Sequence, residues 1–269
     1  MPRTSETFIE EARRVTSRLR ALDRRRVVFG AASHRYRFRP KLSVESVLEF
    51  ERRARVSLPD AYRAFLIELG NGGCGPYYGI VPLDHHSNAV SEEFPYTDPY
   101  EFPEDASDEE MDVPLPGCLR LAEYGCGTEL FLVVNGTTAG QVWFDSRYDS
   151  GLSPAEDASG NRLKFDHWWL RTMGAHLEAF EMIQGLMEHG TPHDEIHNRL
   201  EPKILQLHID EMMLSLMDKD PDGKPSKVPD KPWGVQCGLV EDHYERWQRQ
   251  RSFTKPTALL RRLLRIKEG

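Results

Sequence analysis

Two histidines in the last third of the chain have a spacing that metal sites use. His193 and His197 are four residues apart in a segment with helical periodicity, and Glu201 follows after another four. Side chains four apart lie on one face of a helix, and imidazole and carboxylate groups bind zinc. Such a pair without a companion ligand motif is more typical of a solvated polar face. The sequence therefore predicts no metal and no cofactor.

The side chains that could act as nucleophiles are Cys74, Cys126 and Ser153. Nucleophilic catalysis needs a base and an orienting group next to the nucleophile, and the sequence has no signature for either. Asp145 and Asp149 could form an acid–base pair, but the end of a strand with its turn explains both. We therefore predict that the protein is not an enzyme.

A glycine-rich segment at residues 70–75, GNGGCG, has the composition of a phosphate-binding loop. Phosphate loops connect a strand to the N-terminus of a helix, whereas this segment follows a predicted helix and leads into a predicted strand. Glycine adopts the positive φ angles of tight turns without steric cost. The segment is therefore interpreted as a chain reversal.

An acidic segment indicates a binding partner. Residues 92–112 contain ten carboxylates and no Lys or Arg, and four aromatic residues are interleaved with them. A negative field speeds association with a basic partner, and aromatic side chains supply much of the affinity of protein interfaces. The candidate contact residues are Glu92, Glu93, Phe94, Tyr96, Tyr100, Glu101, Glu104 and Asp105. The alternative is a solvated loop whose aromatic residues pack onto the core.

The net charge of −8 is unevenly distributed: residues 1–55 carry +8 and residues 246–269 carry +7, which leaves −23 for the residues between. Because phosphate contacts supply nucleic-acid affinity, the acidic centre predicts a basic protein partner and no nucleic acid. The four cysteines lack C-x-x-C spacing, which suits a reducing compartment. No run of about 18 apolar residues occurs, so we expect a cytoplasmic protein without a transmembrane segment.

Hydrophobic periodicity predicts the elements that position these residues in one mixed α/β core. Spacings of three or four predict helices over residues 5–24, from residue 44, and over 60–69 and 165–188. Alternation predicts strands at 27–29, 36–38 and 78–83, and an antiparallel meander of 119–123, 129–135 and 141–145. Residues 84–117 have little periodicity and form a long irregular insert.

A change in composition near residue 190 predicts a domain boundary. A capped helix and a second apolar stripe follow it, residues 218–234 contain four prolines, and basic amphipathic helices are predicted at 240–250 and 256–266. We therefore divide the chain into a domain of residues 1–189 and a helical appendage of residues 190–269.

Residues 58–83 read LPDAYRAFLIELGNGGCGPYYGIVPL and follow a predicted helix that carries an acidic residue. Farther along, the chain has LRLAEYGCG, LVVNG, GQVWFD and FDHWW in that order. The order and spacing of these segments resemble the SUKH superfamily over residues 43–180. The residues that carry the resemblance are Glu51, Leu58, Pro59, Tyr62, Phe65, Leu66, Gly70, Asn71, Gly72, Gly73, Pro82, Asn135, Gly136, Trp143 and Trp169.

The resemblance implies an α+β fold in which helices pack around a mainly antiparallel sheet. It also implies one of two functions. Bacterial members of the family are immunity proteins that neutralise a cognate polymorphic toxin, and fungal members regulate cell-wall synthesis as protein adaptors. The shared residues are then determinants of the fold. We predict an immunity protein that binds a basic, nuclease-like toxin domain. The alternative is a regulatory or scaffold adaptor, for which the basic helix at 256–266 would be the binding element.

Overall fold

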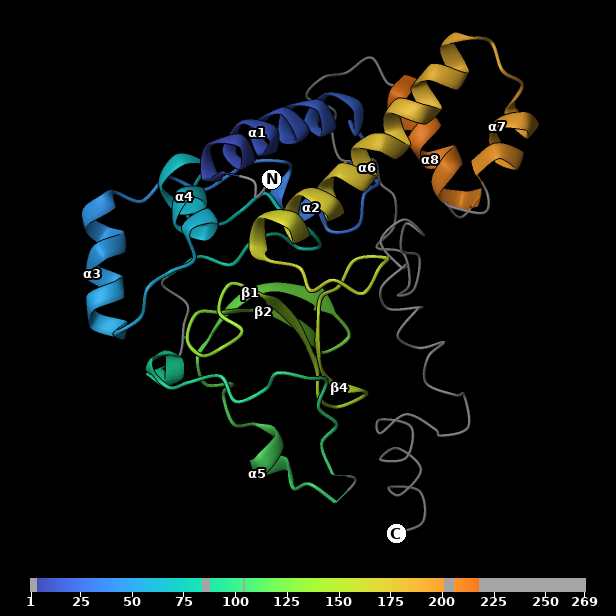
Figure 1. Ribbon diagram of the computed structural model, residues 1–269. Helices are drawn as coiled ribbons and strands as arrows, with labels where there is room; N and C mark the ends of the chain where they lie inside the picture. The colour runs from blue at the N-terminus through green and yellow to red at the C-terminus, as the bar shows by residue number, and fades with distance from the viewer. Residues whose placement is uncertain (1–3, 84–87, 104, 201–205, 218–269) are drawn as a thin grey trace.

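The computed structural model describes residues 4–83, 88–103, 105–200 and 206–217. A layer of helices covers one face of a four-stranded sheet, and the acidic insert lies on the other side of the sheet (Figure 1). This arrangement confirms the α+β class. Within the described ranges, no helix is long and apolar enough to cross a bilayer.

Two long helices pack side by side in the helical layer. α1 (Ser5–Leu22) begins after Thr4, whose hydroxyl caps the first turn. α6 (Phe165–Glu188) presents a broad apolar face to it, and the rings of Phe8 and Trp169 meet edge-to-face with centroids 6.2 Å apart. Both helices confirm the prediction from periodicity.

A single buried carboxylate joins the two helices of the predicted hairpin. α3 (Val44–Ala54) carries Glu51, and α4 (Asp60–Glu68) follows. Oε1 of Glu51 accepts hydrogen bonds from the Leu58 amide at 2.7 Å and from Nη2 of Arg63 at 2.6 Å. The Glu51 side chain is only 10% exposed, so this group fixes the turn between the helices from inside.

The sheet is an antiparallel meander in the order β1-β2-β3-β4. Its strands are β1 (Cys118–Gly125), β2 (Thr128–Val133), β3 (Val142–Ser146) and β4 (Gly151–Pro154). The first three confirm the predicted meander. β4 was not predicted, because four residues containing Gly and Pro have too little alternation to register as a strand.

Both faces of the sheet are buried. Successive residues of a strand point to opposite sides, so the helices cover one set of side chains and the insert covers the other. The first set packs in the main core: Leu119, Leu121, Leu130, Leu132 and Val142. The second set forms a smaller cluster with the insert: Cys118, Val133, Trp143 and Leu152.

The strands predicted at 27–29, 36–38 and 78–83 are wrong. The first two flank a short helix, α2 (Ala31–His34), and Arg35 and Tyr36 have φ angles of 51° and 55°, which no strand contains. Phe38 and Ile80 form only isolated bridges: both pair with Gly73, and Ile80 also pairs with Ala122 of β1. The φ of 91° at Gly73 confirms the predicted chain reversal.

α7 (His193–Leu200) and α8 (Gln206–Met217) lie at one end of α6 (Figure 1). Their buried residues, among them Ile196 and Ile209, belong to the same hydrophobic cluster as α1 and α6. The hydroxyl of Ser215 also donates to the Leu22 carbonyl at 3.2 Å. The described part of the predicted appendage therefore shares the main core, and residues 218–269 with their predicted linker and helices lie outside the described residues.

A neutral histidine is built into the turn after α2. Nδ1 of His34 accepts a hydrogen bond from the Tyr36 amide at 3.0 Å, and a second hydrogen bond joins the ring to the Tyr77 backbone. Burial lowers the pKa of His34 from 6.5 to about 4, and the Tyr77 hydrogen bond opposes this only in part. If Nδ1 were protonated, its N–H would point at the N–H of Tyr36, and the hydrogen bond between them would be lost. The folded state therefore favours the neutral ring.

We expect Glu51→Ala to lower the free energy of unfolding by about 2 kcal/mol, because it leaves the buried Leu58 amide without its acceptor and the half-buried Arg63 with only Asp60 and Ser57. Glu49→Ala, an exposed position on the same helix, is the matched control and should change it by less than about 0.5 kcal/mol. Urea unfolding followed by circular dichroism measures both. Equal effects of the two substitutions would contradict the role assigned to Glu51.

The lowered pKa of His34 predicts a loss of stability in acid. The unfolded chain binds a proton near pH 6.5 and the folded chain only near pH 4, so this contribution is complete above pH 6.5 and falls as the pH drops to 4. The loss is at most about 3 kcal/mol. His34→Asn keeps an acceptor near the position of Nδ1 and should flatten this part of the curve of unfolding free energy against pH. His167→Asn, at an exposed histidine, should leave the wild-type slope.

Candidate protein-binding surface

The acidic insert, residues 84–117, crosses the sheet on the side away from the helices. Its described parts contain a 3-10 turn, η1 (Asn88–Ser91), and one helical turn, α5 (Asp108–Met111). The rest is irregular, as predicted. A long irregular segment in a compact domain is usually functional or disordered, and here many contacts hold it against the sheet.

The aromatic residues of the insert form a continuous row over the sheet. Phe94 is 4% exposed, and its ring lies against Trp143 of β3 with centroids 5.0 Å apart. Tyr96 meets Phe94 at 5.4 Å, Tyr100 meets Tyr96 at 4.7 Å, and Phe102 meets Tyr100 at 5.1 Å. The row buries the apolar face of the sheet that the helices leave uncovered.

Hydrogen bonds tie the backbone of the same segment to two places, Asn135 just after β2 and Leu152 of β4. Near the start of the insert, the side-chain amide of Asn135 donates to the carbonyls of Ser91 and Glu92 at 2.9 and 3.1 Å. Farther on, Tyr100 and Leu152 of β4 exchange backbone hydrogen bonds of 2.9 and 2.7 Å. The insert thereby behaves as an additional edge of the sheet.

Gly151 makes the close approach at β4 possible. A Cβ atom at this position would lie 2.1 Å from the Tyr100 carbonyl oxygen, and the residue has a φ of +84°. Only glycine satisfies both conditions without strain.

Arg147 connects the far end of the insert to the sheet. Its Nε lies 3.0 Å from both carboxylate oxygens of Asp145, and its Nη1 donates to the carbonyls of Met111 and Val113, the latter at 2.8 Å. The guanidinium also lies 5.7 Å from the ring centroid of Phe102. Asp145 is thus committed to an ion pair with Arg147.

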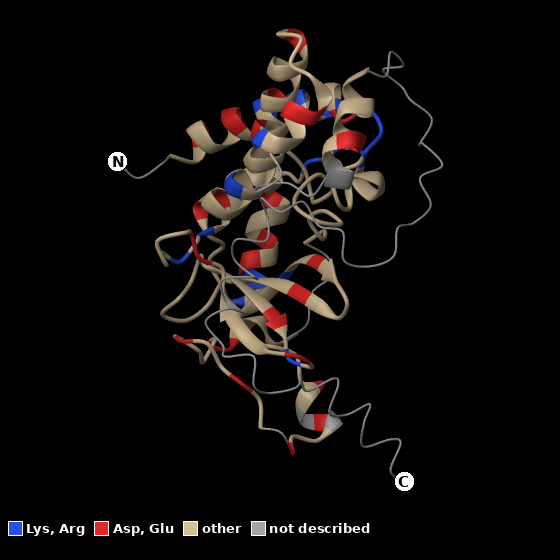
Figure 2. Cartoon of the chain, turned by 90° about the vertical axis from the view of Figure 1, so that its right-hand side faces the viewer, with Lys and Arg blue, Asp and Glu red and all other residues tan. Residues whose placement is uncertain are grey.

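The carboxylates of the insert point outward. Figure 2 shows Asp and Glu along the insert at the bottom of the view, whereas Lys and Arg occur mostly in the upper part. The described acidic residues with exposed side chains are Glu92, Glu93, Asp98, Glu101, Asp105, Glu109 and Asp112. An anchored backbone therefore presents a mostly acidic surface, in which Asp98 is paired with Arg162 at 2.9 Å.

A pocket of about 490 Å³ adjoins this surface, between the end of α5 and the open part of the sheet. Arg120 and Phe131 contribute to its wall, and Arg120 is paired with Glu129 at 2.6 Å. The pocket is open, with charged and apolar groups side by side. Such a recess suits a protruding side chain of a protein partner.

The structure places the predicted contact residues in three environments. Glu92, Glu93, Glu101 and Asp105 are exposed, and Tyr96 and Tyr100 are partly exposed. Phe94 is buried against Trp143. This residue therefore follows the alternative interpretation, in which the aromatic residues of the segment pack onto the core. Glu104 lies outside the described residues. The participation of the exposed members in binding stays a prediction.

The residues that carry the family resemblance serve the fold in the structure. Leu58, Tyr62, Phe65, Leu66, Trp143 and Trp169 are buried. Oδ1 of Asn71 accepts the Leu83 amide at 2.8 Å, which closes the chain reversal after α4. The cysteines differ in environment: burial raises the pKa of Cys74 to about 12, whereas Cys126 is exposed. The Cys74 thiol therefore stays protonated at neutral pH.

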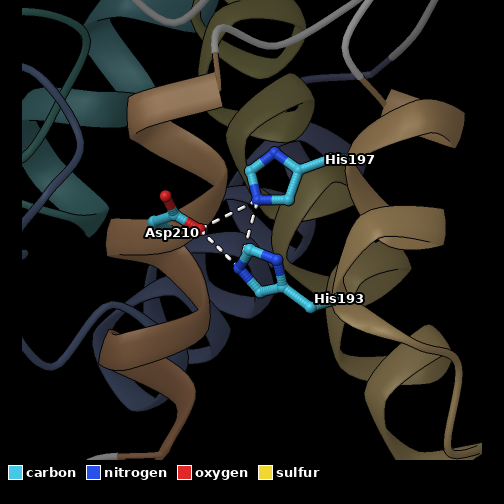
Figure 3. Close-up of side chains that lie close together, drawn as sticks. All are labelled: His193, His197 and Asp210. Carbon is cyan, nitrogen blue, oxygen red and sulfur yellow. Dashed lines mark hydrogen bonds and ion pairs between the residues drawn. The ribbon is translucent and has the colours of Figure 1, made fainter.

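A separate polar cluster lies between α7 and α8 (Figure 3), which Figure 1 shows at the end of the molecule away from α5. His193 and His197 of α7 both lie 2.8 Å from Oδ1 of Asp210 on α8. The predicted solvated face is wrong for His197, which is 4% exposed. Sequence reasoning missed Asp210 because it lies on another helix, and Glu201 is outside the described residues.

Comparison with known protein families agrees with the resemblance found in the sequence. Residues 41–161 match the model of the SMI1 / KNR4 family (SUKH-1). No curated protein and no solved structure matches the chain. The matched segment comprises α3, α4, the insert and the sheet. The family suggests a protein-binding domain of the immunity or regulatory type. The match and the buried positions of the signature residues support a SUKH-like domain over residues 41–161, which is less than half of the chain.

Proposed function

We propose that the protein is a non-enzymatic immunity protein that binds a basic toxin domain through the exposed carboxylates of the acidic insert. The observation that supports this is the division of the insert into two sets of side chains. Its aromatic residues pack on the sheet, and its carboxylates face solvent without any Lys or Arg in the same segment.

The anchoring of the insert favours binding by a preformed surface. A flexible acidic loop would lose conformational entropy when it docks, whereas a backbone held by Asn135, Leu152 and Arg147 has already lost most of it. Rigid carboxylates also keep their mutual repulsion in the free protein. A cationic partner relieves that repulsion when it binds.

A nuclease-like toxin is the partner that this surface suits best. Such an enzyme needs a positive cleft to hold the phosphates of its substrate, and the insert presents carboxylates in place of phosphates. Electrostatic attraction then speeds encounter and is weakened by salt. Neutralisation results from occlusion of the cleft, with no chemical step in the inhibitor.

The first experiment measures inhibition of a toxin domain encoded beside this gene. We expect its activity to fall linearly with added protein and to reach zero at one equivalent, because each complex removes one toxin molecule. Inactivation by far less than one equivalent would show turnover and contradict the non-enzymatic role. Failure to restore growth of cells that express any neighbouring toxin would contradict immunity. Recovery of another protein through residues 254–269 would then favour the adaptor role.

The charge of the insert should control the association rate. In the variant Glu92→Gln/Glu93→Gln/Asp105→Asn we expect the rate constant to fall about tenfold at low salt. The control variant Glu10→Gln/Glu49→Gln/Glu178→Gln removes three exposed carboxylates from the helices and should associate at nearly the wild-type rate. Surface plasmon resonance measures the rate constants at about 0.05 M and about 0.5 M salt. At the higher salt concentration, the wild type should associate no faster than the insert variant. Equal slowing of both variants would exclude the insert as the contact surface.

Anchoring of the insert should contribute separately from its charge. Arg147→Lys preserves the positive charge, but a single ammonium cannot hold Asp145 and the carbonyls of Met111 and Val113 together. We expect faster hydrogen exchange in residues 105–117 and toxin affinity reduced about tenfold, although every exposed carboxylate remains. Arg18→Lys, at an arginine of α1 that is paired with Glu181 at 3.2 Å, is the control. Unchanged exchange and affinity in Arg147→Lys would show that the aromatic row and the hydrogen bonds to Asn135 and Leu152 hold the insert without Arg147.

A further inference from the structure

The cluster of His193, His197 and Asp210 has the geometry of a metal site. The Nε2 atoms of the two histidines are 3.3 Å apart, and all three ligand atoms lie within 4.8 Å of one another. Zinc binds imidazole at about 2.0 Å, and two donors at tetrahedral angles around it are then separated by about 3.3 Å. The two imidazole nitrogens therefore already have the separation that a tetrahedral ion requires.

The third ligand needs only a small movement. Oδ1 of Asp210 lies 2.8 Å from each Nε2, which is a hydrogen-bond distance and is shorter than the separation of two zinc ligands. The Asp210 side chain is 44% exposed, so it can rotate outward by about half an ångström without disturbing the core. The carboxylate of Asp210 supplies the negative charge that two neutral imidazole ligands lack.

The burial of His197 is poorly explained by hydrogen bonds alone. Its side chain is 5% exposed, and its Nδ1 atom is buried without a hydrogen-bond partner among the described residues. A buried imidazole with one unpartnered nitrogen costs stability that an apolar side chain at this place would not. Its other nitrogen points into the cluster, where a ligand would make use of it (Figure 3).

We propose that His193, His197 and Asp210 bind one Zn²⁺ ion, which clamps α7 to α8. Two imidazoles with one carboxylate suit zinc and the neighbouring transition metals, whereas Mg²⁺ and Ca²⁺ prefer oxygen ligands. Three protein ligands leave one coordination position for water. Because α8 is also bonded to the end of α1 through Ser215, the ion fixes the last described helices to the main core. This site is independent of the acidic insert and of the proposed function.

The test uses the full chain without an affinity tag, treated with a chelator and then titrated with Zn²⁺ by calorimetry. We expect one equivalent to bind, with Co²⁺ in its place giving the visible absorption of a tetrahedral site. Zinc at about a hundredfold excess over its dissociation constant should raise the melting temperature by about 5 °C.

Ligand variants locate the ion. His193→Ala, at a side chain that is 57% exposed, and the isosteric Asp210→Asn should each weaken Zn²⁺ binding at least tenfold and abolish the rise in melting temperature. Their circular dichroism spectra without metal should match the wild type. His189→Ala removes an exposed histidine from just beyond the end of α6 and should change nothing. Absence of stoichiometric Zn²⁺ binding to the wild type would overturn the proposal, and so would unchanged binding in His193→Ala.

Discussion

The structure depends on a sheet that is apolar on both of its faces. Alternation along β1, β2 and β3 places Leu119, Leu130 and Val142 on one side, and Cys118, Val133 and Trp143 on the other. A small antiparallel sheet can leave one face in water only if that face is polar. Here the second face needs a cover, and the helices are already used on the first. The insert is that cover, which explains why a segment so rich in charge also carries regularly spaced aromatic rings.

This requirement resolves the two interpretations of the acidic segment into one arrangement. The aromatic side chains pack on the sheet, as a loop without a partner would require, and they thereby hold the carboxylates in fixed positions. Phe94 cannot be both the cover of Trp143 and an anchor in a partner, because its ring is in the core. Binding through this surface then depends on exposed charge, on the edges of Tyr96 and Tyr100, and on the recess beside Arg147.

The sequence predicts those parts of the fold whose periodicity results from local packing. α1, α3, α4, α6 and the three longer strands each bury one regular stripe or alternate set, and each is recovered within a few residues. The segments at 27–29, 36–38 and 78–83 have the composition of strands, but their conformation is set by left-handed residues and by isolated bridges to Gly73. Tertiary contacts override propensity there, because these segments pair with their neighbours at single positions only, such as Ile80 with Gly73 and with Ala122 of β1.

The same limit applies to sites that two elements share. The pair His193 and His197 is visible in the sequence because both lie on one helix, whereas Asp210 comes from α8 and approaches only when α7 and α8 pack together. That packing is itself part of the main core, since Ile196 and Ile209 are buried in one cluster with α6, and Ser215 reaches the end of α1. A boundary placed by composition near residue 190 therefore marks a change in sequence character, while the hydrophobic core continues across it. An ion that holds α7 against α8 would therefore act on the helical layer itself.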